Sequence, residues 1–167
     1  MQSSIQPSRT KRTLLRPRLQ WYDDNRFSLE NVVVNMQDQL SRFIVANTPI
    51  RGEVVRLETT WQSVLERHEY PIALRNILGE LMAAAALLTA TLKLDGALVL
   101  QIQGDGLVSL LVVECNSDMT MRATAKWSEE LPATANLGAL VGNGKCVITL
   151  LPNEGQSYQG VVPLEGD

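Results

Sequence analysis

The sequence is poor in the side chains that carry most catalytic and metal-binding chemistry. It has a single histidine, His68, and two cysteines, Cys115 and Cys146, in 167 residues. The cysteines stand far apart and lack C-x-x-C spacing, so they form neither a zinc motif nor a disulfide framework. Because each lies in an apolar run, we expect two buried free thiols, which suits a reducing compartment. No group of His, Cys, Asp and Glu has metal-ligand spacing, so we assign no metal site.

Catalytic signatures are also missing, and we assign no catalytic residue. His68 falls near the end of an expected helix, with Glu66 and Glu69 beside it. A general base needs a nucleophile and a pocket, and no such motif accompanies it, so we expect a surface or helix-end histidine. The adjacent Glu129 and Glu130 lie in an expected loop and are interpreted as a solvated acidic patch. The chain is therefore not expected to be an enzyme.

Two glycine-rich turns are candidates for phosphate binding, and neither completes its motif. Gly104-Asp105-Gly106 follows an expected strand, but Ser109 stands where the dinucleotide fingerprint has its third glycine. Around Gly144-Lys145, Ala139 replaces the first P-loop glycine and Cys146 replaces the Ser or Thr. Both are interpreted as structural turns. A small-ligand-binding or enzymatic α+β domain that uses these turns stays open as the alternative function.

Acidic residues are absent from the first eighteen positions, which hold 5 of the 15 basic residues. The remainder carries 10 basic and 18 acidic residues, a net charge of −8 that should repel nucleic acid and anionic membranes. We interpret residues 1–35 as a disordered or non-native extension, with a transit peptide or a basic nucleic-acid arm over Arg9 to Arg18 as alternatives. Within it, Val32-Val33-Val34 is a candidate short strand. No stretch near the N-terminus has the apolar core of a secretory signal.

Apolar runs are too short for a membrane span, which needs about 20 residues. The uncharged apolar run Leu81 to Leu92 is bounded by Glu80 and Lys93. Together with the preceding apolar residues at helical spacing from Leu74 onward, it predicts a long core helix that opens at Pro71. The following segment, Ala97 to Gln103, alternates as a half-buried strand does, with Leu98, Leu100 and Ile102 on one side.

Shorter patterns predict the other elements. We expect a short helix over Gln37 to Ala46 ended by Thr48-Pro49, a strand over Gly52 to Thr59, and a helix capped by Thr59 or Thr60. Further strands are expected over Leu107 to Cys115, Met119 to Trp127, Lys145 to Leu151 and Gln156 to Leu164, with one helical turn over Leu137 to Val141. Strands and helices are segregated, so the fold class is α+β with a mainly antiparallel sheet and a long apolar central helix.

Apolar residues in the expected strands exceed what one buried face requires: Val108, Leu110, Leu111, Val112, Val113, Val147, Ile148 and Leu150. A two-sided core or a dimer interface would account for them. So would a surface that binds exposed apolar segments of other proteins, because large apolar patches usually mark interaction sites.

Several strings resemble the N-terminal domain of the heat shock protein 33 family of redox-regulated holdase chaperones: DQLSRF, IRGEVVRL, HEYP, LLTATLKLDG, LQIQGDG and LVGNGKCVITLLPNEGQSYQGVVPLEGD. The resemblance covers about residues 36–167 and implies crossed antiparallel sheets and a possible homodimer. It also implies an ATP-independent, cytoplasmic chaperone that binds unfolding or oxidatively damaged client proteins under oxidative and heat stress. From the acidic charge of the chain we expect no nucleic-acid or membrane partner.

The sequence departs from that family at its control module. The family binds zinc through a C-terminal C-x-C and C-x-x-C cluster, and no such cluster is present here. Cys115 and Cys146 do not match its positions, so we expect no cofactor in this chain. We interpret residues 36–167 as a chaperone N-terminal domain, truncated at its C-terminal end. The client-binding residues are unknown at this point, because no compact motif marks them.

Overall fold

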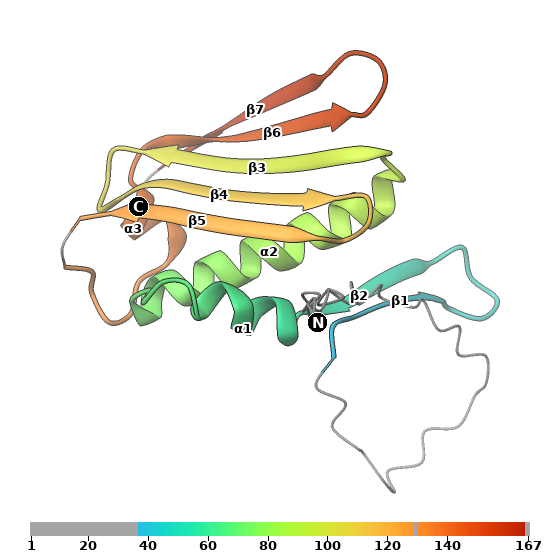
Figure 1. Cartoon of the computed structure of the whole chain (residues 1–167), viewed down its shortest axis with the longest axis horizontal. Helices are drawn as coiled ribbons and strands as arrows, with labels where there is room; N and C mark the ends of the chain where they lie inside the picture. The colour runs from blue at the N-terminus through green and yellow to red at the C-terminus, as the bar shows by residue number, and fades with distance from the viewer. Residues whose placement is uncertain (1–36, 129, 166–167) are drawn as a thin grey trace, which may run out of the picture.

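The computed structural model describes residues 37–128 and 130–165 (Figure 1). In chain order, this part contains β1 (Gln39–Ile44), β2 (Arg51–Arg56), α1 (Thr59–Leu65), α2 (Ile72–Leu92), β3 (Gly96–Gly104), β4 (Val108–Asn116), β5 (Met121–Trp127), α3 (Leu137–Val141), β6 (Gly144–Pro152) and β7 (Tyr158–Leu164). Strands β1 and β2 form a two-stranded sheet, and the other five form a sheet in the order β5-β4-β3-β6-β7. Every strand pair is antiparallel, which confirms the predicted α+β class.

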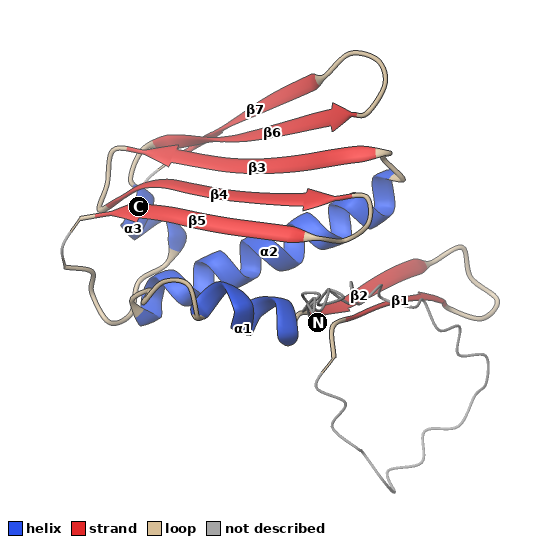
Figure 2. Ribbon diagram, in the orientation of Figure 1, coloured by secondary structure: helices blue, strands red, loops and turns tan. Residues whose placement is uncertain are grey.

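The core lies between α2 and one face of the five-stranded sheet (Figures 1 and 2). Leu74, Leu78 and Met82 of α2 are completely buried, and so are Leu98 and Leu111 of the sheet. By length and composition alone α2 would suffice to cross a membrane, since its mean hydropathy reaches 1.5 over eighteen residues. Its packing against the sheet makes it the core helix that the sequence predicts.

Both ends of α2 follow from local sequence. Pro71 is the N-cap, and its fixed φ suits the entry to a helix. Lys93 adopts the left-handed conformation, with φ of 51°, and ends the helix. Gly96 then starts β3 with φ of 150°, where a Cβ atom would lie 2.1 Å from the carbonyl oxygen of Leu151. Only glycine fits at that approach of β3 to β6.

The two faces of the five-stranded sheet differ. Among the apolar strand residues singled out above, Val108, Leu111 and Val113 are buried in the core, and Ile148 and Leu150 pack against it. The remaining three, Leu110, Val112 and Val147, point to the opposite face by strand alternation. No helix in the described part of the chain covers that face (Figure 2).

The prediction of a helix over Gln37 to Ala46 is wrong, because this segment forms β1. The offsets of Leu40, Phe43 and Ile44 suit a helix, but pairing with β2 along six residues takes precedence over that weak local signal. The Asn-Thr-Pro segment makes the hairpin turn instead of a helix end. Asn47 adopts a left-handed φ of 61° there, and Val45 N donates to Ile50 O at 3.0 Å.

The predicted cap of α1 is also wrong. Its N-cap residue is Glu58, which makes no side-chain cap hydrogen bond. The carboxylate of Asp38, from the chain before β1, accepts from Thr60 N at 3.0 Å and from Thr60 Oγ1 at 2.5 Å. A carboxylate distant in sequence therefore satisfies the helix N-terminus, and it fixes the start of the β1–β2 hairpin to α1.

Candidate functional site: an exposed apolar hairpin

The side chains considered for catalysis lie apart and at the surface. His68 is exposed just beyond α1, as predicted, and its ring meets that of Tyr70 edge-on at 5.7 Å. Glu130 is exposed, as expected for a solvated patch, whereas Glu129 lies outside the described residues. Residues 1–36, with the basic arm and the Val32-Val33-Val34 segment, also lie outside them. Within the described ranges, no three His, Cys, Asp or Glu side chains gather as metal ligands would.

The two glycine-rich turns pack against each other. Asp105 N donates to Asn143 O at 3.1 Å, and Gly106 N donates to Val141 O at 2.8 Å. A Cβ atom on Gly104 would lie 2.1 Å from the same Val141 oxygen. A phosphate cradle needs backbone N–H groups that point at the anion, and here two of them are already engaged by carbonyls. The arrangement agrees with the interpretation of both segments as structural turns.

The two cysteines do not converge. Cys115 pairs with Leu98 and Cys146 with Ile102, so they lie on opposite neighbours of β3, four residues apart along it. At about 3.4 Å per residue and 4.8 Å per strand, their backbones stand well over 10 Å apart. A disulfide or a shared metal ion is excluded at that separation. Both thiols are free, Cys115 buried and Cys146 only half-buried, which corrects the expectation for the second.

Burial raises the pKa of both thiols. For Cys115, desolvation is the main cause, opposed by the neighbouring Thr89 hydroxyl and reinforced by the charge of Asp118. For Cys146, desolvation alone raises the pKa. Thiolates are the reactive form, so neither residue has the microenvironment of a redox-active or metal-binding cysteine.

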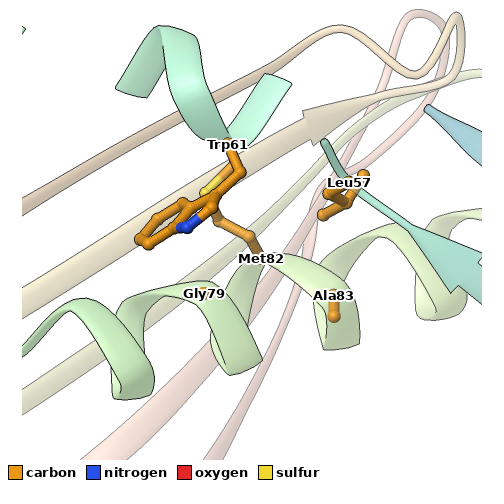
Figure 3. Close-up of a pocket in the computed structure, with 5 residues that line it drawn as sticks. All are labelled: Leu57, Trp61, Gly79, Met82 and Ala83. Atoms are coloured by element: carbon orange, nitrogen blue, oxygen red, sulfur yellow. The ribbon is translucent and has the colours of Figure 1, made fainter. Parts of the chain in front are cut away.

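The hollow between α1 and α2 is small and apolar (Figure 3). Its volume is about 230 Å³, and its lining consists of Leu57, Trp61, Gly79, Met82 and Ala83. The Trp61 ring covers the helix at Gly79, and no ionisable group lines the space. A second, shallower hollow of about 580 Å³ lies where the β4–β5 and β6–β7 turns meet the start of β3. Neither hollow combines an enclosed shape with convergent polar groups, as a small-molecule site does.

Exposed apolar side chains gather on two hairpins instead. Among residues 37–128 and 130–165, thirteen large apolar residues are exposed. Nine of them belong to the β1–β2 and β6–β7 hairpins: Phe43, Ile44, Val45, Ile50, Val54, Leu151, Tyr158, Val161 and Val162. Scattered single apolar residues need no explanation, but clusters of this kind mark contact surfaces. These two hairpins are therefore the candidate functional surfaces of the chain.

The β1–β2 hairpin presents one apolar face to solvent, which we call the open face. Strand alternation and register place Phe43, Val45, Ile50 and Val54 on this side, with exposed fractions between 41% and 58%. Gly52 lies opposite Phe43, and a Cβ there would lie 2.1 Å from the end of the Phe43 ring. The end of the ring thus lies over the glycine, and it joins the two strands into a continuous apolar surface.

The other face of this hairpin is fixed to α2 by polar contacts. Arg42 Nε donates to Glu53 Oε1 at 2.7 Å, and Arg42 Nη2 donates to the Ala90 carbonyl at 2.6 Å. Thr91 Oγ1 donates to the other oxygen of Glu53 at 3.1 Å. A guanidinium at the C-terminal turn of a helix is favourable, because the last carbonyls of the helix are unsatisfied. The open face is thereby turned away from the core.

Fold and surface place the chain among α+β domains whose accessible apolar residues lie on hairpins rather than in a cleft. The family model for the Hsp33 protein matches residues 38–167. A 33 kDa chaperonin of Methylobacillus flagellatus is 56% identical over 135 residues, or 80% of this chain and 46% of that protein. An Escherichia coli 33 kDa chaperonin is 51% identical over 130 residues, or 78% of this chain and 44% of the other. The chain belongs to the Hsp33 family of heat shock chaperonins.

A solved structure confirms the fold independently. The crystal structure of the Thermotoga maritima 33 kDa chaperonin superimposes with a TM-score of 0.61 over 68% of this chain and 41% of that one, at 24% sequence identity. The matched part of the chain therefore shares that protein's fold. The chain spans less than half the length of the relatives it matches.

Sequence reasoning missed the open face because it predicted the wrong element for β1. On a helix, Leu40 and Phe43 would share one buried stripe; on a strand, they point to opposite sides, and Phe43 becomes exposed. The Gly52 position beside Phe43 was the available signal, since an aromatic residue across from a strand glycine is a recurrent pairing device.

Proposed function

We propose that this chain is an ATP-independent chaperone domain, a holdase that binds unfolding proteins and prevents their aggregation. The observation that carries the proposal is the clustering of exposed apolar side chains on two hairpins, in a member of a family whose relatives are named chaperonins. A nonpolar surface that stays accessible in the folded state is what an unfolded polypeptide needs in order to be held. The proposed role is binding, with no catalysed reaction.

The proposal extends to conditions and place of action. We infer that clients are unfolding or oxidatively damaged proteins of the cytoplasm, bound during oxidative and heat stress, and that the chain forms homodimers. We propose no nucleic-acid or membrane partner. Because its two cysteines are far apart and protonated by burial, the chain should hold clients without zinc and without redox control.

Light scattering of a heat-denaturing client, without ATP, tests the proposal. We expect the purified chain to lower the scattering at a near-equimolar ratio to the client, and to do so equally with peroxide or with a thiol reductant. Scattering that is unchanged at a several-fold molar excess of the chain would refute the holdase role. Stoichiometric zinc in the purified protein, measured by elemental analysis, would refute the metal-free part of the proposal.

A further inference from the structure

The β1–β2 hairpin is an incomplete sheet. A two-stranded ribbon is marginal in water by itself, and a third strand or a packed face is needed for stability. Here α2 supports one face near Leu40 and Val55, which are half-buried, while the open face stays exposed. In the described part of the chain, β1 pairs only with β2, so the outer edge of each strand presents unpaired backbone groups. Such an edge is a template for an added strand.

Positive charge lies at both ends of β2. The described residues carry nine arginines and lysines, and three of them, Arg42, Arg51 and Arg56, lie in this hairpin. Arg42 is paired with Glu53, whereas Arg51 and Arg56, at the two ends of β2, are exposed. By strand alternation Arg56 lies on the open face and Arg51 on the other face. The chain as a whole is acidic, with a net charge of −3. The hairpin thus combines an apolar strip with two cationic ends, which complements an apolar segment that has carboxylates at its ends.

The β6–β7 hairpin is less suited to strand addition. Its edge strand β7 has exposed Val161 and Val162 but no charged residue. Pro163 lies within β7 and removes a backbone N–H from that edge. Charge and backbone continuity therefore both favour the β1–β2 hairpin.

We propose that the open face and outer edge of the β1–β2 hairpin bind an extended apolar segment flanked by aspartate or glutamate, which adds to the ribbon as a third strand. Backbone hydrogen bonds along the edge supply affinity that does not depend on side-chain identity, as binding of varied unfolded proteins requires. Alternate side chains of the segment contact Phe43, Ile50 and Val54 on the open face. Its terminal carboxylates meet Arg56 on that face and Arg51 on the opposite face of the ribbon. This inference rests on the proposed holdase function and names its substrate class and site.

Fluorescence anisotropy with the full chain tests the inference directly. The probes are three labelled peptides of about twelve residues: an alternating valine and threonine segment with aspartates at both ends, the same segment with lysines at its ends, and the aspartate version with two central prolines. We expect tight binding of the first only. Equal binding of the lysine peptide would overturn the charge preference, and equal binding of the proline peptide would overturn strand addition.

Matched variants locate the site. I50T/V54T removes apolar surface from the open face while it keeps β-branched side chains, and we expect binding to weaken about tenfold. The control is I72T, which changes an exposed isoleucine at the start of α2, outside both hairpins, and should leave binding unaltered. R51Q/R56Q should lose the preference for aspartate over lysine ends. Wild-type affinity in both hairpin variants would place the site elsewhere.

The remaining outcomes distinguish other occupants of the open face from the proposed segment. They also distinguish failure of this inference from failure of the holdase function. If I50T/V54T abolishes self-association in sedimentation but leaves peptide binding intact, a second copy of the chain occupies the face, and the inference fails. If the aspartate peptide binds only after deletion of residues 1–35, the chain's own N-terminal segment occupies it, and the inference also fails. If wild type and I50T/V54T suppress client aggregation equally, the holdase function stands without this site. If neither suppresses aggregation, the holdase function itself fails.

Discussion

Replacing Gly79 by alanine should stabilise the protein, which is uncommon for a substitution in a core helix. Gly79 lies in the interior of α2, where glycine costs about 1 kcal/mol relative to alanine. A Cβ atom there would lie 3.6 to 3.8 Å from three carbons of the Trp61 ring, an ordinary van der Waals distance. The methyl group would enter the apolar hollow of about 230 Å³ beside that ring without displacing anything.

The expected gain is therefore the helix propensity, about 1 kcal/mol, with a small addition from the new contact. For a chain of this size it corresponds to a rise of about 2–4 °C in the midpoint of thermal unfolding, followed by far-UV circular dichroism. Ala83→Gly, in the same helix and beside the same hollow, should lower the midpoint by a similar amount. A lower midpoint for Gly79→Ala would refute this reasoning, because it would mean that the Trp61 ring leaves no room for a methyl group on α2.

Three further predictions concern other contacts. Gly104→Ala should lower the free energy of unfolding by about 2–4 kcal/mol in urea titrations, because the new Cβ would meet the Val141 carbonyl. A loss under about 0.5 kcal/mol, the error of such a titration, would contradict the packing of the two turns against each other. A double-mutant cycle with Arg42→Met and Glu53→Gln should give a coupling free energy of about 0.5–1 kcal/mol between the two side chains. The coupling should shrink in high salt, since Arg42 is 44% exposed, and a salt-independent coupling would contradict an ion pair. Burial raises the pKa of Cys115, so its stabilising contribution is complete below the unfolded thiol pKa of about 8.5 and declines as pH rises above it. The midpoint of thermal unfolding should therefore fall between about pH 8 and 10, and Cys115→Ala should make this fall less steep. An unchanged slope in the variant would show that other groups cause the pH dependence.

Local patterns were sufficient for most of the fold. The uncharged run through α2 and the alternation of β3 are strong, short-range signals, and both elements form where they were expected. The hairpin of β6 and β7 follows from its Pro152 to Gly155 turn in the same way. In these segments, propensity, periodicity and turn residues all favour one structure.

The sequence-based predictions fail where residues far apart in the sequence determine the local structure. Segment 37–46 has helical offsets, but it becomes β1 through pairing with β2, and no local pattern contains that information. Asp38 caps α1 from twenty-two residues away. The turns at Gly104 and Gly142 were expected as turns, whereas their mutual docking depends on the antiparallel pairing of β3 with β6. The open face is the product of such non-local pairing, so the sequence alone did not reveal it.

We propose that clients bind to an exposed hairpin surface of this chain and not in a cleft. Hydrogen exchange of the full chain, with and without a heat-denatured client, measures this directly. We expect slowed exchange in residues 39–56 on client binding, and little change at the hollow lined by Trp61 and Met82. Protection at that hollow, with unaltered exchange in the hairpin, would contradict it.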